Sequence, residues 1–259
     1  MEDLRKYNPE GSILRKAQLR MLDILQVIDG ICQKHNIPYF LDGGSLIGAV
    51  RHGGFIPWDD DLDIAVMRED FYKLRKILQQ ELPENFVYQD STTDSNYPLL
   101  IGKVRDTQSY FEEEYTDKLE YKGIYVDIIP MEKIPSLKWK AKLDYWYGHC
   151  FRAIHNYTDT KDKIVSCCVI PFAWMLVQCT RLLNKCSSST QIAHMYGWKA
   201  YNSYSSTDVF PVKRMFFEHI EVYVPKNPDA VLKALFGDYM QVPPPEKRVT
   251  HTGKIEFYD

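Results

Sequence analysis

The run Asp59-Asp60-Asp61-Leu62-Asp63 constrains this chain most, because it places four carboxylates in five positions. Carboxylates so close repel and raise each other's pKa, so folding alone does not favour such a run. In a strand, Asp61 and Asp63 share one face while Leu62 and Ile64 point to the other, toward a core. Asp59 joins that face if the strand begins early enough. Mg²⁺ or Mn²⁺ prefers such hard oxygen ligands, so the run predicts a divalent-metal site.

A glycine-rich segment upstream predicts a phosphate site. Residues 37–41 are typical of a short buried strand, and Gly43, Gly44 and Ser45 then permit a sharp turn before a helix over 46–50. A helix N-terminus behind small residues offers free N–H groups and a positive dipole end to an anion. A glycine pair alone is also typical of an ordinary turn, and an acidic cluster alone of a solvated loop; their combination favours a site.

The stretch from Phe40 to Ile64 resembles the signature of the LicD family, which also includes fukutin and fukutin-related protein. The resemblance implies a nucleotidyltransferase fold with its Gly-Ser turn and Asp-x-Asp motif. It also implies a phosphotransferase that moves a phospho-alcohol from a CDP-activated donor to a glycan, most like a bacterial phosphorylcholine transferase.

The resemblance continues in residues 123–130, which are similar to the second strand motif of the family and make Asp127 the expected third metal carboxylate. The alternative is an acidic residue at a strand end. Lys103 and Arg105 alternate in sequence and should share one face, where they would neutralise charge on the departing CMP. Ordinary surface cations are nearly as good an interpretation of this pair.

Further donor-binding residues are expected from the same resemblance. Arg51 and Trp58 lie between the glycine turn and the acidic run, and Trp58 is a candidate for cation–π contact with choline. The segments 236–240 and 243–248, followed by His251, resemble the closing segment of the family. The complete expected donor set is Gly43, Gly44, Ser45, Arg51, Trp58, Lys103, Arg105 and His251, and the expected metal set is Asp59, Asp61, Asp63 and Asp127.

The periodicity predicts an α+β fold with a small mixed or antiparallel sheet and packed helices. Helices are predicted over 12–35, 69–81 and 229–235, and strands over 86–89, 99–105, 109–114, 121–129 and 222–224. The region 137–198 is predicted to be helical, with a loop near 196–206 on the acceptor side. We expect a catalytic core over 1–135 and a helical, acceptor- or membrane-facing part over 136–259 whose closing segment packs back on the core.

The apolar run 164–177 has two interpretations. It is shorter than the roughly 20 residues that span a bilayer, and Pro171 should kink it, so a buried core helix is one of them. The other is an interfacial helix on an anionic leaflet, because Lys161, Lys163, Arg181 and Lys185 flank the run. Peripheral membrane contact through 164–185 would suit a lipid-linked acceptor.

Composition excludes some classes of function. The net charge of −3 offers no basic face for nucleic acid, so no nucleic-acid partner is expected. The first eleven residues lack a secretory pattern, and the six cysteines form no CxxC pair or disulfide framework, which favours a cytoplasmic protein, peripheral at most on the inner membrane face. The cysteine spacing matches no zinc finger, so buried thiols are favoured over structural zinc.

The expected reaction is metal-dependent displacement on a CDP-alcohol by a glycan hydroxyl, with release of CMP. CDP-choline is the favoured donor and a teichoic acid or lipopolysaccharide precursor the expected acceptor. Ribitol or glycerol phosphate transfer is an alternative. So are a nucleotidyltransferase acting on an NTP and an inactive binding module of the same fold.

Overall fold

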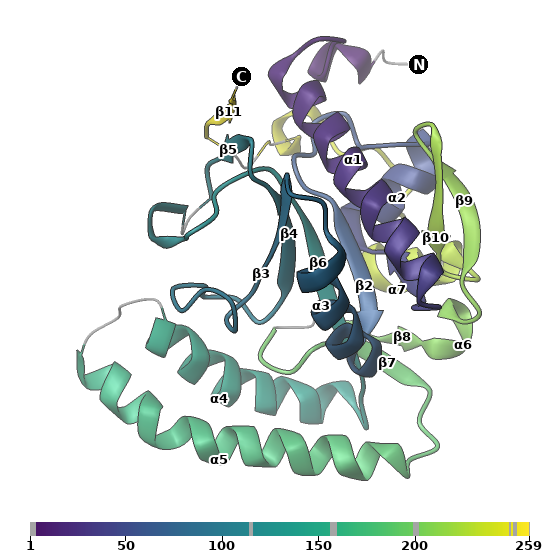
Figure 1. Ribbon diagram of the computed structural model, residues 1–259. Coiled ribbons are helices and arrows are strands. Elements are labelled where there is room, and N and C mark those ends of the chain that lie inside the picture. Colours follow the sequence, from purple (N-terminus) through teal and green to yellow (C-terminus); the bar gives the residue numbers. More distant parts are fainter. Residues whose placement is uncertain are drawn as a thin grey trace.

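A mixed sheet forms the centre of the protein in the computed structural model, which describes residues 4–113, 116–155, 160–198, 202–248, 250 and 253–258 (Figure 1). The strands lie in the order β1-β2-β6-β4-β3, and β7 and β8 continue from β6. Strands β2 and β6 are parallel, and the other neighbours are antiparallel. The prediction of a mixed α+β fold is therefore confirmed. The sheet strands are β1 (Tyr39–Leu41), β2 (Asp63–Met67), β3 (Phe86–Gln89), β4 (Gly102–Asp106), β6 (Tyr125–Lys133), β7 (Gln191–His194) and β8 (Tyr204–Ser205).

Helices α1 (Ile13–Lys34) and α3 (Arg68–Glu81) pack against β2, β4 and β6, as the periodicity predicted. The Ser12 hydroxyl caps α1 by accepting a hydrogen bond from the N–H of Arg15. Helix α1 buries its apolar stripe in the same core cluster as Ile64 and Ile128 of the sheet. Asp63 and Asp127, one position before these isoleucines, therefore point to the opposite face.

The remaining elements surround this core. Helix α2 (Gly43–His52) follows β1, and the small elements η1 (Leu4–Tyr7), η2 (Thr116–Lys118), α6 (Ser206–Val209) and η3 (Pro245–Lys247) lie in the connections. Strands β9 (Lys213–Phe217) and β10 (Ile220–Val224) form a hairpin, α7 (Pro228–Phe236) follows it, and β11 (Ile255–Phe257) pairs with β5 (Ser109–Phe111). The predicted strand over 222–224 and helix over 229–235 are confirmed.

The structure differs from the prediction at several elements, and three of these differences concern the site. Helix α2 begins at Gly43, so the glycines form its first turn rather than a turn before it. Strand β2 begins only at Asp63, so Asp59 and Asp61 lie in the preceding loop and not on the strand. Strand β7, in a region predicted to be helical, adds to the sheet from the second half of the chain. The division into two parts at residue 135 stays a prediction.

The region after the sheet forms a helical hairpin, α4 (Leu137–His155) and α5 (Thr160–Lys185), whose helices lie side by side (Figure 1). Pro171 lies inside α5, which continues past it. The interpretation of 164–177 as a buried core helix is wrong, because large apolar side chains of α5 such as Phe172 and Leu183 are exposed. In the described part of the chain, α5 is long and apolar enough to cross a membrane.

The six cysteines are free thiols. Cys32 and Cys150 are buried, as predicted, and burial together with nearby aspartates raises the pKa of Cys32. The other four are exposed on α5 or just after it, so the expectation of buried thiols is wrong for Cys167, Cys168, Cys179 and Cys186.

Candidate active site

The register of the two parallel strands places two predicted carboxylates beside each other. Asp63 of β2 pairs with Asp127 of β6, and the N–H of Asp127 donates to the carbonyl oxygen of Leu62 at 2.9 Å. Registered neighbours in a sheet project from the same face, so both side chains belong to one surface. Asp61 lies in the loop before β2, and its charge acts on both carboxylates.

The first turn of α2 lies against these carboxylates. A methyl group on Gly44 would lie 2.7 Å from Oδ2 of Asp59, and one on Gly43 would lie 3.4 Å from Oδ2 of Asp63. Gly43 also has a φ of +52°, which favours glycine. The glycines therefore allow the helix N-terminus and the carboxylates to approach closely, as a site for both phosphate and metal requires.

Ser45 makes a contact that was not predicted from the sequence. Its hydroxyl oxygen accepts a hydrogen bond of 2.8 Å from the N–H of Asp63, and the side chain is buried. This contact fixes the first residue of β2 relative to α2. Donor binding by Ser45 stays a prediction, whereas its role in positioning Asp63 is visible in the structure.

The carboxylates lie in a strongly repulsive environment. Burial and then the charges of Asp61, Asp127, Asp42 and Asp59 raise the pKa of Asp63 well above its ordinary value. Burial, with Asp61 and Asp60, raises the pKa of Asp59 to about 8. The effect is the one expected for like charges held together out of water.

Burial also raises the pKa of Asp127 to about 6, although Lys103 opposes the shift. The ammonium of Lys103 lies 2.7 Å from Oδ1 of Asp127 and 2.9 Å from Oε1 of Glu113. Lys103 is buried, so it supplies a positive charge directly at the carboxylate surface. These contacts place Lys103 beside the acidic cluster, whereas its predicted role at the departing CMP stays a prediction.

Arg105 shares the face of Lys103, as predicted, because both side chains bind Glu113. The Arg105 guanidinium is fully buried and donates to Glu113, to the side chain of Gln89 and to the carbonyl oxygen of Gly123. Burial alone would raise the pKa of Glu113, but the two cations lower it to about 2. Arg105 thus supports Glu113 and, through it, Lys103; these contacts do not test donor binding.

Two other predicted donor residues contact segments near the two ends of the chain. Arg51 donates to the carbonyl oxygen of Tyr239 at 2.7 Å. Trp58 is buried and contacts the ring of Tyr7 and the guanidinium of Arg248. His251 lies outside the described residues. Donor contact by these three side chains stays a prediction.

The sequence interpretation missed an imidazole–carboxylate pair on the same side of the sheet. Nε2 of His194, on β7, lies 2.6 Å from Oδ2 of Asp42, the residue that precedes α2. Burial and the charge of Asp42 raise the pKa of the nearby Tyr204 hydroxyl. Only the position of Asp42 directly before Gly43-Gly44 gave a signal for this pair in the sequence. Glu113 was missed as well, because no motif marks it.

The donor set fits a divalent metal in its chemistry. The candidates are partly buried carboxylates, and a cation would remove the repulsion that raises their pKa values. Among the described residues, however, no three acidic, histidine or cysteine side chains are already arranged to hold an ion. Lys103 instead compensates Asp127 in this conformation.

A cavity of about 570 Å³ lies away from these residues. It lies at the other end of β2 and β6, and its lining includes Arg68, Glu132 and Arg181 but none of the predicted site residues. We assign the candidate site to the carboxylate surface, because the acidic side chains and Lys103 lie there and the cavity contains none of them.

Comparisons with known proteins agree with the motif. The family model LicD/FKTN/FKRP, nucleotidyltransferase domain, matches residues 36–179. Lipopolysaccharide cholinephosphotransferase LicD from Haemophilus influenzae is 26% identical over 258 residues, covering 92% of this chain and 95% of that protein. Ribitol 5-phosphate transferase FKRP from Mus musculus is 39% identical over 69 residues, covering 26% of this chain and 14% of that protein.

Among solved structures, terminal uridylyl transferase 4 from Trypanosoma brucei with bound GTP has a TM-score of 0.26 and 9% identity over 57% of this chain and 49% of that chain. That overlap is too low to assign a fold. The family match, by contrast, includes β1, α2, β2 and β6, which build the candidate site, and extends over more than half of the sequence. The chain belongs to the LicD/FKTN/FKRP nucleotidyltransferase-domain family.

Proposed function

We propose that this protein transfers a phospho-alcohol from a CDP-alcohol to a cell-surface glycan and releases CMP. Family membership and the similarity to a named cholinephosphotransferase make the chain a phosphotransferase. Phosphocholine is the group we favour, with CDP-choline as donor and a lipopolysaccharide or teichoic acid precursor as acceptor, because the relative similar over most of the chain is a lipopolysaccharide cholinephosphotransferase. The alternative is ribitol phosphate, which the FKRP similarity supports. Glycerol phosphate is a further alternative.

The register of Asp63 with Asp127, opposite the glycine-lined first turn of α2, carries the proposal. Asp61, Asp63 and Asp127, with Asp59, would hold Mg²⁺ or Mn²⁺. When bound, the ion would supply Lewis-acid stabilisation of the phosphate oxygens and lower the pKa of the attacking hydroxyl. The nucleotidyltransferase fold is part of the proposal, supported by this combination of a Gly-Ser helix start and adjacent acidic strands.

The side chains of the site have separate roles in the proposed reaction. The N–H groups at the start of α2, at Gly43 and Gly44, would bind the diphosphate of the donor. Lys103 would offset the negative charge that develops on the leaving CMP. The hydroxyl oxygen of the glycan forms a bond to phosphorus, and the bond between phosphorus and the CMP oxygen breaks. The hydroxyl proton passes to a carboxylate. Asp127 is our candidate to receive this proton, because it lies next to Asp63 in the strand register of the site.

Location on the cytoplasmic side of the membrane is also proposed. Free thiols at all six cysteines support a reducing compartment. A lipid-linked glycan precursor on the inner face would then meet the enzyme and its CDP-activated donor in the same compartment.

The test is incubation with CDP-choline, CDP-ribitol, CDP-glycerol or CTP plus Mg²⁺, with and without a glycan acceptor, while CMP and pyrophosphate are measured. We expect acceptor-dependent CMP release from CDP-choline. Asp61→Asn should abolish it, whereas Asp23→Asn, at an exposed aspartate of α1, should not. Pyrophosphate from CTP would instead identify a nucleotidyltransferase. Absence of any product from every donor would support an inactive binding module.

A further inference from the structure

Helix α5 has an inverted distribution of side chains. A helix on the surface of a protein in water normally buries its large apolar residues and exposes its polar ones. Here Phe172 is 68% and Leu183 73% exposed. The residues that α5 buries are small or polar in large part, namely Ser166, Ala173, Val177, Thr180 and Asn184. Small and polar residues at the helix–helix contact, with large apolar residues outward, are typical of helices in contact with lipid.

Helix α4 shows part of this inversion. It buries Lys140 and Asp144, whose side chains form an ion pair, and exposes the aromatic side chains of Trp139, Tyr145 and Trp146. Tryptophan and tyrosine favour the level of the lipid headgroups, because their rings are apolar and carry one polar atom. Both helices of the hairpin therefore bury polar contacts and expose large apolar side chains, although α4 also buries Leu143 and Phe151.

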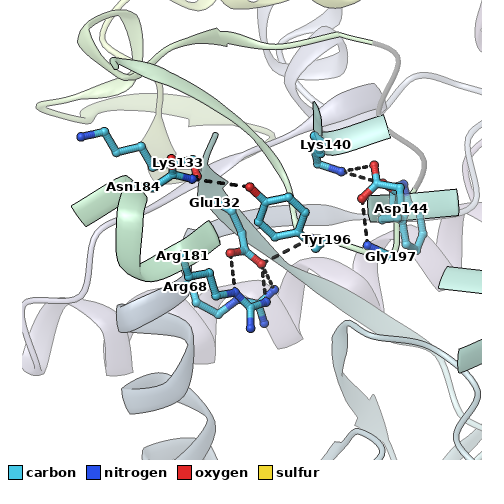
Figure 2. A network of polar contacts seen from close by, with 10 residues as sticks. Arg68, Glu132, Lys133, Lys140, Asp144, Arg181, Asn184, Tyr196 and Gly197 are labelled. Atoms are coloured by element: carbon cyan, nitrogen blue, oxygen red, sulfur yellow. Dashed lines mark hydrogen bonds and ion pairs between the residues drawn. The ribbon is translucent and has the colours of Figure 1, made fainter. Parts of the chain in front are cut away.

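Buried polar contacts hold the hairpin against the sheet (Figure 2). Glu132, near the end of β6, accepts hydrogen bonds from Arg181 of α5 at 2.6 and 2.8 Å and from Arg68 of α3 at 2.7 Å. The side-chain amide of Asn184 donates to the carbonyl oxygen of Lys133 at 2.8 Å. These contacts orient α5, so its outward surface is a fixed feature of the fold.

The N-terminal helix of the hairpin is held in the same way. The carboxylate of Asp144 accepts a hydrogen bond of 2.9 Å from the N–H of Gly197, while Lys140 donates to the carbonyl oxygen of Trp198 at 2.8 Å. Glycine at position 148 permits close packing, because a methyl group there would lie 2.3 Å from the carbonyl oxygen of Gly197. The inner side of α4 is thus packed against the rest of the protein.

The outward apolar residues of α5 form a continuous stripe. Val165, Phe172, Leu176 and Leu183 are all exposed, and they follow one another at intervals of seven and four residues. Residues at these intervals lie along one side of a helix. A stripe of this kind presents a single apolar surface along α5 rather than scattered exposed side chains.

The charge around this stripe favours an anionic surface. Residues 137–185 contain eight lysines and arginines against three aspartates, although the whole chain has a net charge of −3. Basic residues beside an apolar helix face attract anionic lipids. The same excess of positive charge disfavours pairing of two hairpins from separate copies, because like charges would oppose each other.

We infer that the α4–α5 hairpin docks the protein on an anionic lipid bilayer, with α5 lying in the plane of the interface. Its length and hydropathy would also permit a membrane span. However, Arg181 and Asn184 tie its C-terminal part to β6, and α4 packs beside it. A helix held at these points lies along the surface.

The orientation of the protein on the bilayer determines where the glycan acceptor must lie. Strand β2 runs from Asp63 toward the hairpin (Figure 1), and its five residues span about 13 Å from first to last. The carboxylate surface therefore lies at the end of the strand remote from the bilayer. The glycan hydroxyl that it reaches would stand out from the headgroups rather than lie within them.

The experiment is sedimentation of the full chain with phosphatidylcholine vesicles, with and without phosphatidylglycerol. We expect binding to the phosphatidylglycerol vesicles that weakens with salt, and release by alkaline carbonate. Phe172→Asp combined with Leu183→Asp should lower the partition coefficient at least about tenfold. Ile13→Asp combined with Phe216→Asp is the matched control, because it makes the same chemical change at exposed residues of α1 and β9.

A second measurement uses the unaltered protein. Tryptophan fluorescence should shift to shorter wavelength on anionic vesicles and be quenched by brominated lipid chains. Failure to sediment, equal binding by the two double variants, absence of bromolipid quenching, or resistance to carbonate would each overturn the inference. So would a dimer that the Phe172/Leu183 substitutions dissociate, detected by light scattering without lipid. None of these outcomes depends on catalytic activity, so they leave the proposed function to its own test.

Discussion

Gly44→Ala separates the catalytic role of the glycine turn from its structural role. The added methyl group would lie 2.7 Å from Oδ2 of Asp59, whereas ordinary contact begins near 3.4 Å. The carboxylate must therefore move by about 0.7 Å. Because the obstacle is the end of a side chain, the movement requires no change in the backbone.

The expected result is a large loss of activity with little loss of stability. Alanine is favoured over glycine in a helix by up to about 1 kcal/mol. Crowding costs about 1 to 3 kcal/mol in a packed site, with the lower end expected where a side chain can yield. The two effects nearly offset each other. A displacement approaching 1 Å at a site that positions reacting groups can cost up to about 100-fold in rate.

Gly48→Ala is the matched control in the same helix. Its methyl group would lie 2.4 Å from the backbone carbonyl oxygen of Gly54, which cannot move without the chain around it. We expect Gly48→Ala to lower stability by about 1 to 2 kcal/mol, measured by urea unfolding. Rates of CMP release per folded molecule should fall far more for Gly44→Ala. Equal activity of Gly44→Ala and the unaltered protein would refute the close approach of α2 to Asp59.

Three further outcomes follow from the charges and the backbone. Burial raises the pKa of Asp127 to about 6 and, with neighbouring carboxylates, that of Asp59 to about 8. The folded ion-free protein then keeps protons that the unfolded chain releases, so its free energy of unfolding should fall as pH rises from about 4 to 8. Asp127 alone should account for about 3 kcal/mol of this fall. Addition of Mg²⁺ at pH 8 should restore the lost stability. Urea unfolding at pH 5 and 8 tests this, and equal stability at both would contradict it. Glu113→Gln should cost about 3 to 5 kcal/mol, because it leaves the buried Arg105 without its anion; an unchanged urea midpoint would exclude that role. Pro171→Ala should raise the thermal midpoint, since proline inside a helix costs up to about 3 kcal/mol; circular dichroism would show a lower midpoint if the idea were wrong.

Periodicity identified the helices that pack on the core. The stripe of α1 and that of α3 repeat at three and four residues, and both helices formed close to the predicted bounds. These segments are long enough for a helical repeat of apolar residues to be distinguished from a chance pattern. The pairing of Asp63 with Asp127 needed more than a pattern, because strand register depends on residues far apart in sequence.

Other features could not be predicted because they depend on tertiary contacts. Glu113 becomes important only through Lys103 and Arg105, and no local motif marks it. Strand β7 is a four-residue segment defined by pairing with β6, and it brings His194 to the site. Hydropathy detected the apolar segment of α5 but could not tell whether its large side chains face a protein core or the outside.

The most direct test of the central claim is a crystal structure of the protein grown with Mn²⁺, with the ion located by its anomalous scattering. We expect a peak coordinated by Asp61 and Asp63, with Asp127 or Asp59 nearby and the first turn of α2 facing it. Loss of the peak in Asp63→Asn would assign the ligand. Mn²⁺ bound elsewhere, with these carboxylates empty of metal, would contradict the account.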